Sequence, residues 1–213
     1  MNVAIESSHC KLYGTDQCWN TLYDALQTAG GAGFIQTMPY EKRMRDFRVT
    51  TIFEGTSEIH SIYPPLTLFR DYGKDLKQKG VVGKFFYLQG LAGRSLLNRV
   101  KVSDPRLRSA IATATRCEGA FGTLAKAGLL KHGRDIPNQE YFLRKMTHLS
   151  LSLFSLLSSV MYLQSVGVSE EGLAALEYLR QEALEVLARI GTGKKSGIEN
   201  ASGRIFELLD STS

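Results

Sequence analysis

The sequence contains a run of 24 residues, 146–169, without a single Asp, Glu, Lys or Arg. A run of this length is long enough to cross a bilayer as one helix. Seven of its residues are serine, however, and its leucines recur at the spacing of one helix face. These features favour a helix that is buried among other helices over a transmembrane span.

Apolar residues follow helical spacing through most of the chain. This spacing predicts helices over residues 2–29, 107–131, 138–167, 170–190 and 198–210, with Pro137 in the first turn of the third. Alternating β-branched or aromatic runs bounded by turn residues do not occur, so almost no sheet is expected. The predicted fold class is therefore all-α.

Local signals place several helix ends. The pair Gly30–Gly31 predicts the end of the first helix. Thr56 or Ser57 can cap a further helix with Glu58 in its first turn. We expect Pro64–Pro65 to interrupt that helix, because neither proline can donate a backbone hydrogen bond.

The composition excludes several classes of protein. With 43% hydrophobic and 22% charged residues, the chain resembles soluble globular proteins. A net charge of +5 and a pI near 9.1 are too mild to indicate nucleic-acid binding. Three cysteines without a CxxC spacing predict neither disulfides nor a zinc site and favour a reducing compartment, and the four histidines show no metal-ligand spacing, so no metal is expected.

Two glycine-containing segments could be mistaken for phosphate loops. Residues 191–196 fail the P-loop pattern, because Lys195 stands where Ser or Thr must follow the lysine. Residues 30–33 could cradle a phosphate or form a turn, and the turn is favoured because no strand precedes them. Glu54, taken by itself, is most simply a capping carboxylate beside Gly55, which would allow a ligand to approach the backbone closely.

Two segments are similar to consecutive motifs of the acyl-CoA dehydrogenase family. Residues 27–34 read QTAGGAGF and match the family's Q-x-x-G-G-x-G-F signature. Residues 40–59 read YEKRMRDFRVTTIFEGTSEI and resemble the family's E-R-x-x-R-D block that ends in E-G-T-[NS]. The helical sequence after residue 128 resembles the additional C-terminal domain of the very-long-chain branch.

This resemblance implies a division of the chain. Residues 1–73 correspond to the last part of the family's C-terminal helical domain, and residues 109–213 to an additional helical-bundle domain. Between them, residues 74–108 carry nine Lys or Arg and two acids around an apolar stripe, which suggests a basic linker or a contact with a membrane surface. The candidates for membrane contact are Lys84, Phe85, Phe86, Arg94 and Arg99.

The resemblance also assigns roles to residues. Glu54 occupies the place of the catalytic base, which removes the α-proton of an acyl thioester while a β-hydride passes to FAD, and Gly55 matches the residue whose backbone lies against the thioester. The positions that match FAD-binding residues are Gln27, Gly30, Gly31, Thr56, Ser57 and Glu58. Pro64–Pro65 departs from the family's continuous helix at this point.

By resemblance, the function is α,β-dehydrogenation of long- or very-long-chain acyl-CoA in mitochondrial β-oxidation, at the matrix face of the inner membrane. The implied partners are acyl-CoA, electron-transfer flavoprotein, membrane lipid and a second subunit of the full-length protein. The family's other domains and a targeting segment have no counterpart in this sequence, so we expect the chain alone to be inactive and to hold no FAD. Two alternatives stay open: a non-catalytic scaffold related to the paralogue that assists complex I assembly, and a membrane-surface helical module.

Overall fold

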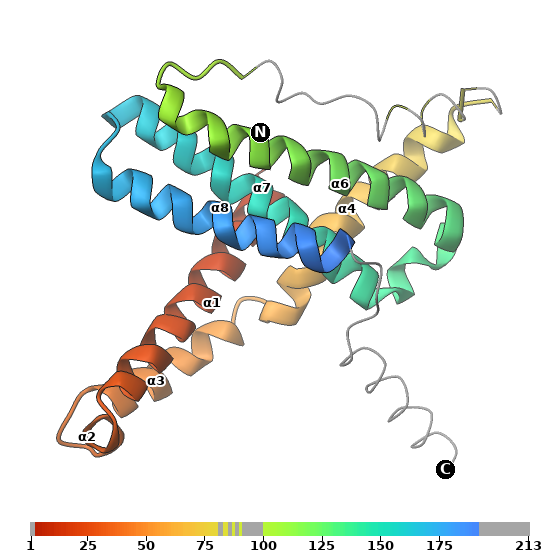
Figure 1. Cartoon of the computed structure of the whole chain (residues 1–213). Helices are drawn as coiled ribbons and strands as arrows, with labels where there is room; N and C mark the ends of the chain where they lie inside the picture. Colours follow the sequence, from red (N-terminus) through yellow and green to blue (C-terminus); the bar gives the residue numbers. More distant parts are fainter. Residues whose placement is uncertain (1–2, 81–82, 85–86, 88–89, 91–99, 192–213) are drawn as a thin grey trace, which may run out of the picture. The chain divides into compact units, whose positions relative to one another are not determined.

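The computed structural model describes residues 3–80, 83–84, 87, 90 and 100–191. These residues form helices and turns without any strand, which confirms the predicted all-α fold class. The chain divides into two compact units, which Figure 1 shows in sequence colours. Unit 1 is Met1–Tyr87 with Ile136–Asn138, and unit 2 is Leu88–Asp135 with Gln139–Ser213.

Unit 1 is built on one long helix. Its elements are α1 (Ala4–Thr28), α2 (Gly31–Phe34), α3 (Tyr40–Arg48), the 3₁₀ turn η1 (Val49–Thr51) and α4 (Ser57–Lys77). The helix α1 contacts both α3 and α4, and α2 lies at the end of unit 1 where α1 and α3 meet (Figure 1). Leu12 of α1 and Phe69 of α4 are buried apolar residues, whereas Ser8 and His9 of α1 are buried polar ones.

The helix ends of unit 1 follow the local signals. The helix α1 ends at Thr28, and Gly30 then adopts a left-handed φ of 58° before α2 begins. Thr56 caps α4, since its Oγ1 accepts a hydrogen bond from the Ile59 N–H at 3.3 Å, and Glu58 lies in the first turn. Both predicted boundaries are confirmed.

The expected break at Pro64–Pro65 is wrong. The helix α4 runs without interruption from Ser57 to Lys77, and both prolines are buried within it. Each proline removes one donor from the helix, but its fixed φ is compatible with helical geometry. Burial of the two rings adds apolar contact that offsets the missing hydrogen bonds.

The described part of unit 2 is a bundle of three helices that contact one another (Figure 1). Its elements are η3 (Pro105–Leu107), α6 (Arg108–His132), most of η4 (Gly133–Asn138), α7 (Glu140–Val166) and α8 (Glu170–Gly191). The core consists of Leu107, Ala110, Ala114, Cys117, Leu156, Val160, Leu163, Leu176 and Ala183. Three of the predicted helices are confirmed here, and the fourth, over 198–210, lies outside the described residues.

The start of α7 differs from the prediction. Pro137 lies inside the 3₁₀ turn η4, and α7 begins only at Glu140. Gly133 ends α6 with a left-handed φ of 51°, and the chain completes a tight turn before the next helix starts. The proline therefore lies in the connection and not in the first turn of α7.

The uncharged run forms most of α7. Among the described helices, α7 alone has the length and apolar composition needed to cross a membrane, with a mean hydropathy of 1.5 over 18 residues. One face of α7 is buried, including Leu149, Leu156 and Val160. Met161 and Tyr162 are exposed. Residues on the buried face of α7 therefore form part of the core of unit 2.

Candidate functional site

The short segment between η1 and α4 has an unusual backbone. Glu54 has φ of 55° and Gly55 has φ of 93°, so two successive residues are left-handed. Within the described ranges, Glu54 is the one residue other than glycine with a positive φ. A residue with a Cβ costs roughly 1–2 kcal/mol in this conformation. Such residues concentrate at functional sites.

Side chains from α1 and α4 hold this Glu54–Gly55 turn. The Lys11 ammonium donates a hydrogen bond to the Gly55 carbonyl oxygen at 2.7 Å. The Nε2 atom of His60 lies 3.2 Å from the Glu54 carbonyl oxygen, and its Nδ1 lies 2.8 Å from the Ser8 hydroxyl. A Cβ on Gly55 would lie 2.8 Å from His60 Nε2, so the turn fits against the imidazole only as glycine. The Glu54 side chain itself is exposed.

The next three residues line a hollow at the start of α4. Thr56, Ser57 and Glu58, three of the expected FAD-binding residues, border a space of about 230 Å³. The other lining residues are Asp16, Trp19, Arg48, Thr51 and Ile52. The N-terminal end of a helix carries free N–H groups and the positive end of the helix dipole, and Arg48 adds a cation, whereas Asp16 and Glu58 add two carboxylates. The hollow is therefore polar and of mixed charge, which suits a polar ligand group.

Arg48, Trp19 and Asp16 also line the hollow, and the sequence analysis singled out none of these three side chains. The Arg48 guanidinium lies over the Trp19 ring, 5.6 Å from its centroid, and also contacts the Thr51 hydroxyl. Asp16 accepts a hydrogen bond from the Ser57 hydroxyl at 3.2 Å. Arg48 belongs to the motif at residues 40–59 and could have been singled out there, whereas Trp19 and Asp16 lie on α1 without any local signal.

The other expected FAD-binding residues lie elsewhere in unit 1. Gln27 is in the last turn of α1, and Gly30 and Gly31 follow at the start of α2. From Trp19 to Gln27 the helix rises by roughly 12 Å at 1.5 Å per residue. All three residues are exposed, and a Cβ on either glycine would meet nothing within 4 Å. The structure therefore keeps them apart from Thr56, Ser57 and Glu58.

The expected membrane-contact residues are mostly beyond the structure. Phe85, Phe86, Arg94 and Arg99 lie outside the described residues, and Lys84 is exposed. No group of His, Cys, Asp or Glu side chains in the described part of the chain has an arrangement that could hold a metal ion.

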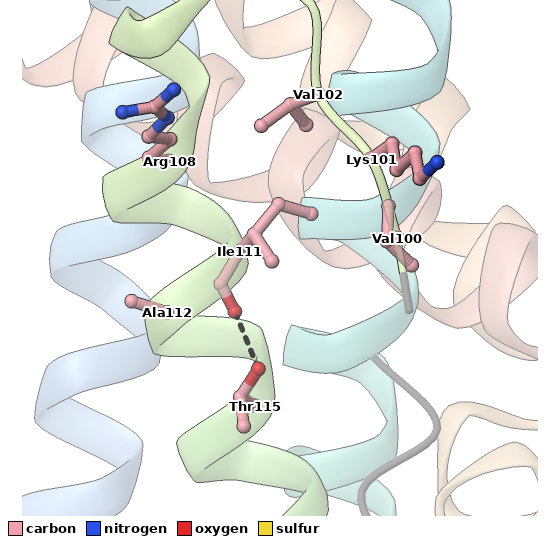
Figure 2. Close-up of a pocket in the computed structure, with 7 residues that line it drawn as sticks. All are labelled: Val100, Lys101, Val102, Arg108, Ile111, Ala112 and Thr115. Carbon is pink, nitrogen blue, oxygen red and sulfur yellow. Dashed lines mark hydrogen bonds between the residues drawn. The ribbon is translucent and has the colours of Figure 1, made fainter. Parts of the chain in front are cut away.

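Unit 2 has a hollow of about 670 Å³ between residues 100–102 and the first turns of α6. Figure 2 shows Val102 and Ile111 in its centre, with Lys101 and Arg108 on opposite sides of them. The two cations point away from each other and do not converge on one point (Figure 2). This hollow contains none of the site residues that the sequence predicted.

Comparisons with known proteins agree with the motifs. The acyl-CoA dehydrogenase C-terminal domain model matches residues 2–62. The very long-chain specific mitochondrial acyl-CoA dehydrogenase of Homo sapiens is 28% identical over 166 residues, which cover 71% of this chain and 25% of that protein. The short-chain specific enzyme of Rattus norvegicus mitochondria is 39% identical over 67 residues, or 32% of this chain and 16% of that protein. The chain thus spans about a quarter or less of these relatives.

A solved structure shares the fold. The crystal structure of an acyl-CoA dehydrogenase complexed with FAD from Bacillus anthracis superposes with a TM-score of 0.71 at 22% identity, over 97% of this chain and 36% of that one. This likeness shows that the chain shares the fold of that enzyme, and residues 2–62 are similar to the acyl-CoA dehydrogenase C-terminal domain.

Proposed function

We propose that this chain supplies the catalytic base and part of the FAD site of an acyl-CoA dehydrogenase that acts on long- or very-long-chain substrates. The observation that carries the proposal is the Glu54–Gly55 turn, a left-handed turn placed directly before the capped start of α4. The Glu54 carboxylate would take the α-proton of the acyl thioester as a general base. FAD, when bound, accepts the β-hydride.

The residues present fit part of FAD. The hollow at the start of α4 combines helix N–H groups, three hydroxyls, the Arg48 cation and the carboxylates of Asp16 and Glu58, which suits a polar portion of the cofactor. Gly30 and Gly31 offer exposed backbone at the other end of α1, which agrees with contact to a flavin held mainly by a second subunit. At about 230 Å³ the hollow is smaller than a typical ligand pocket of roughly 300–1,000 Å³. We infer that this chain alone holds no FAD and has no activity.

The extent of the similarity supports the very-long-chain branch. The match to the human very long-chain enzyme extends over 166 residues, and the match to the short-chain enzyme of rat over 67. Because unit 1 accounts for fewer than 166 residues, the longer match must continue into unit 2. The substrate class, electron-transfer flavoprotein as acceptor, homodimerisation and the matrix face of the inner membrane are parts of the same proposal.

The test is the Glu54→Gln variant in a chimera, in which this chain replaces the corresponding part of the Bacillus anthracis enzyme. The amide keeps the shape of the side chain but cannot take a proton, so we expect turnover to fall at least ~100-fold. FAD absorbance and acyl-CoA binding should stay unchanged. Glu185→Gln, an exposed position on α8, is the matched control. Turnover near that of the control would refute the assignment of Glu54.

One observation favours a second function. Large apolar side chains of unit 2 are exposed on α7 and α8, including Met161 at 68%, Tyr162 at 64% and Tyr178 at 57%. Exposed apolar residues of this kind suit a helical surface that contacts another protein or a membrane. A chimera that binds FAD but turns over no acyl-CoA with Glu54 intact would favour this scaffold function.

A further inference from the structure

The left-handed backbone of the Glu54–Gly55 turn requires something that stabilises it. Gly55 adopts its φ of 93° at little cost, but Glu54 at 55° carries a Cβ and is strained. Strained residues persist where their surroundings hold them in place. Each of the two carbonyl groups of the turn accepts one side-chain hydrogen bond, from His60 and from Lys11.

The bond from His60 fixes the protonation of its ring. A backbone carbonyl can only accept a hydrogen bond, so the Nε2 atom that faces Glu54 must carry the proton. In the neutral imidazole, Nδ1 is then an acceptor, and the Ser8 hydroxyl donates to it at 2.8 Å. Ser8 is buried on α1, so it holds the imidazole in one orientation from a rigid position.

The same imidazole fills the space beside Gly55. A Cβ built on Gly55 would lie 2.8 Å from His60 Nε2, which is shorter than the contacts that real Cβ atoms make. A turn that moved out of its left-handed conformation would lose both the His60 and the Lys11 bonds, because both acceptors are carbonyls of the turn itself. His60 thus joins α1, α4 and the turn between η1 and α4 at one point.

We propose that His60 is a positioning residue, which uses its Nε2–H to hold the Glu54 carbonyl and thereby keeps the Glu54 side chain presented from a left-handed turn. Ser8 orients the imidazole, and Lys11 anchors the neighbouring Gly55 carbonyl. The functional meaning of this arrangement rests on the proposed role of Glu54 as base, but the conformational role of His60 does not depend on it.

Two near-isosteric variants of the 213-residue chain separate the two ring nitrogens. In His60→Gln, the terminal amide nitrogen takes the approximate place of Nε2, so the bond to Glu54 is kept and the bond to Ser8 is lost. In His60→Asn, the amide lies near the place of Nδ1, so the bond to Ser8 is kept and the bond to Glu54 is lost. Backbone ¹³C chemical shifts and three-bond couplings then report the sign of φ at Glu54.

We expect positive φ at Glu54 in the wild type and in His60→Gln, and its loss in His60→Asn. His148→Asn, at an exposed position on α7, is the matched control and should leave the turn unchanged. Far-ultraviolet circular dichroism verifies that every variant keeps its helices. Positive φ retained in His60→Asn would overturn the proposal, as would its equal loss in both His60 variants, which would indicate a general packing role.

The NMR experiment tests the role of His60, and the turnover experiment tests the role of Glu54, so that either role can be refuted without the other. The NMR measurement is made without FAD or acyl-CoA, so loss of the turn in His60→Asn alone supports the positioning role even if Glu54→Gln has no effect on turnover. Conversely, an unchanged turn in that variant removes His60 from the proposal and leaves the assignment of Glu54 as base untouched.

Discussion

At the scale of single residues, the three cysteines differ in exposure. Cys10 and Cys18 are exposed on α1, whereas Cys117 is buried in the core of unit 2. Burial raises the pKa of the Cys117 thiol to about 11, which keeps it protonated at neutral pH. Since the thiolate is the reactive form, we expect a thiol reagent at roughly pH 8 to label the two exposed cysteines in the folded chain and Cys117 only after unfolding. Mass spectrometry of the labelled peptides checks this, and rapid native labelling of Cys117 would contradict it.

His9 links stability to pH. It is buried on α1, and its Nδ1 donates to the Ile5 carbonyl oxygen at 2.8 Å. Burial lowers the pKa of His9 from 6.5, with the Ile5 bond and the Glu6 charge opposing this effect. As the pH falls below 6.5, His9 is therefore protonated more readily in the unfolded chain than in the folded chain. The free energy of unfolding falls as the pH drops through this range.

The variant His9→Asn isolates this effect. The asparagine amide can keep the bond to Ile5 but does not titrate. Urea unfolding at about pH 7.5 and about pH 5.5 should show a larger loss of stability in the wild type than in His9→Asn. Equal losses in both proteins would show that His9 does not carry this dependence.

At the scale of the element, the N-cap of α4 is the contact most easily tested. Thr56 Oγ1 accepts from the Ile59 N–H, and Thr56→Val removes the acceptor while keeping the shape. We expect a loss of about 1 kcal/mol in the free energy of unfolding. Thr21→Val, in the middle of α1 with an exposed hydroxyl, is the control, because Thr21 caps nothing. An equal loss in both variants, measured by urea unfolding, would rule out a stabilising cap.

Element boundaries were largely predictable, and the clearest exception is the expected break in α4. The end of α1 at Thr28, shortly before Gly30, and the cap at Thr56 depend on residues within one turn of the boundary. Pro64–Pro65 was expected to break α4 on the same local reasoning. Burial of both rings outweighs that local cost, and burial is set by residues distant in sequence.

At the scale of the whole molecule, the packing of α6 against α7 includes a close approach at one glycine. A Cβ on Gly128 of α6 would overlap the ring of Phe142 on α7. Gly128→Ala should therefore lower the free energy of unfolding by roughly 1–3 kcal/mol, although alanine favours the helix itself by about 1 kcal/mol. Urea unfolding measures the change.

A second glycine on the same helix provides the matched control. A Cβ on Gly119 would meet nothing within 4 Å, so Gly119→Ala should stabilise the chain by up to about 1 kcal/mol. Opposite signs in the two variants are the expected result. Stabilisation by both would show that α6 and α7 do not approach each other this closely at Gly128.

The sequence by itself determined the all-α class, most helix bounds and the similarity of residues 2–62 to the acyl-CoA dehydrogenase C-terminal domain, because helical periodicity, caps and motifs are encoded within a few neighbouring residues. The motif also located the segment from Glu54 to Glu58, whose roles stay predictions. Only the tertiary structure placed Ser8 against His60, which are 52 residues apart, and brought Trp19 to Arg48. Such pairs form when helices from distant parts of the chain bury their faces together, and no local pattern specifies which side chains then meet.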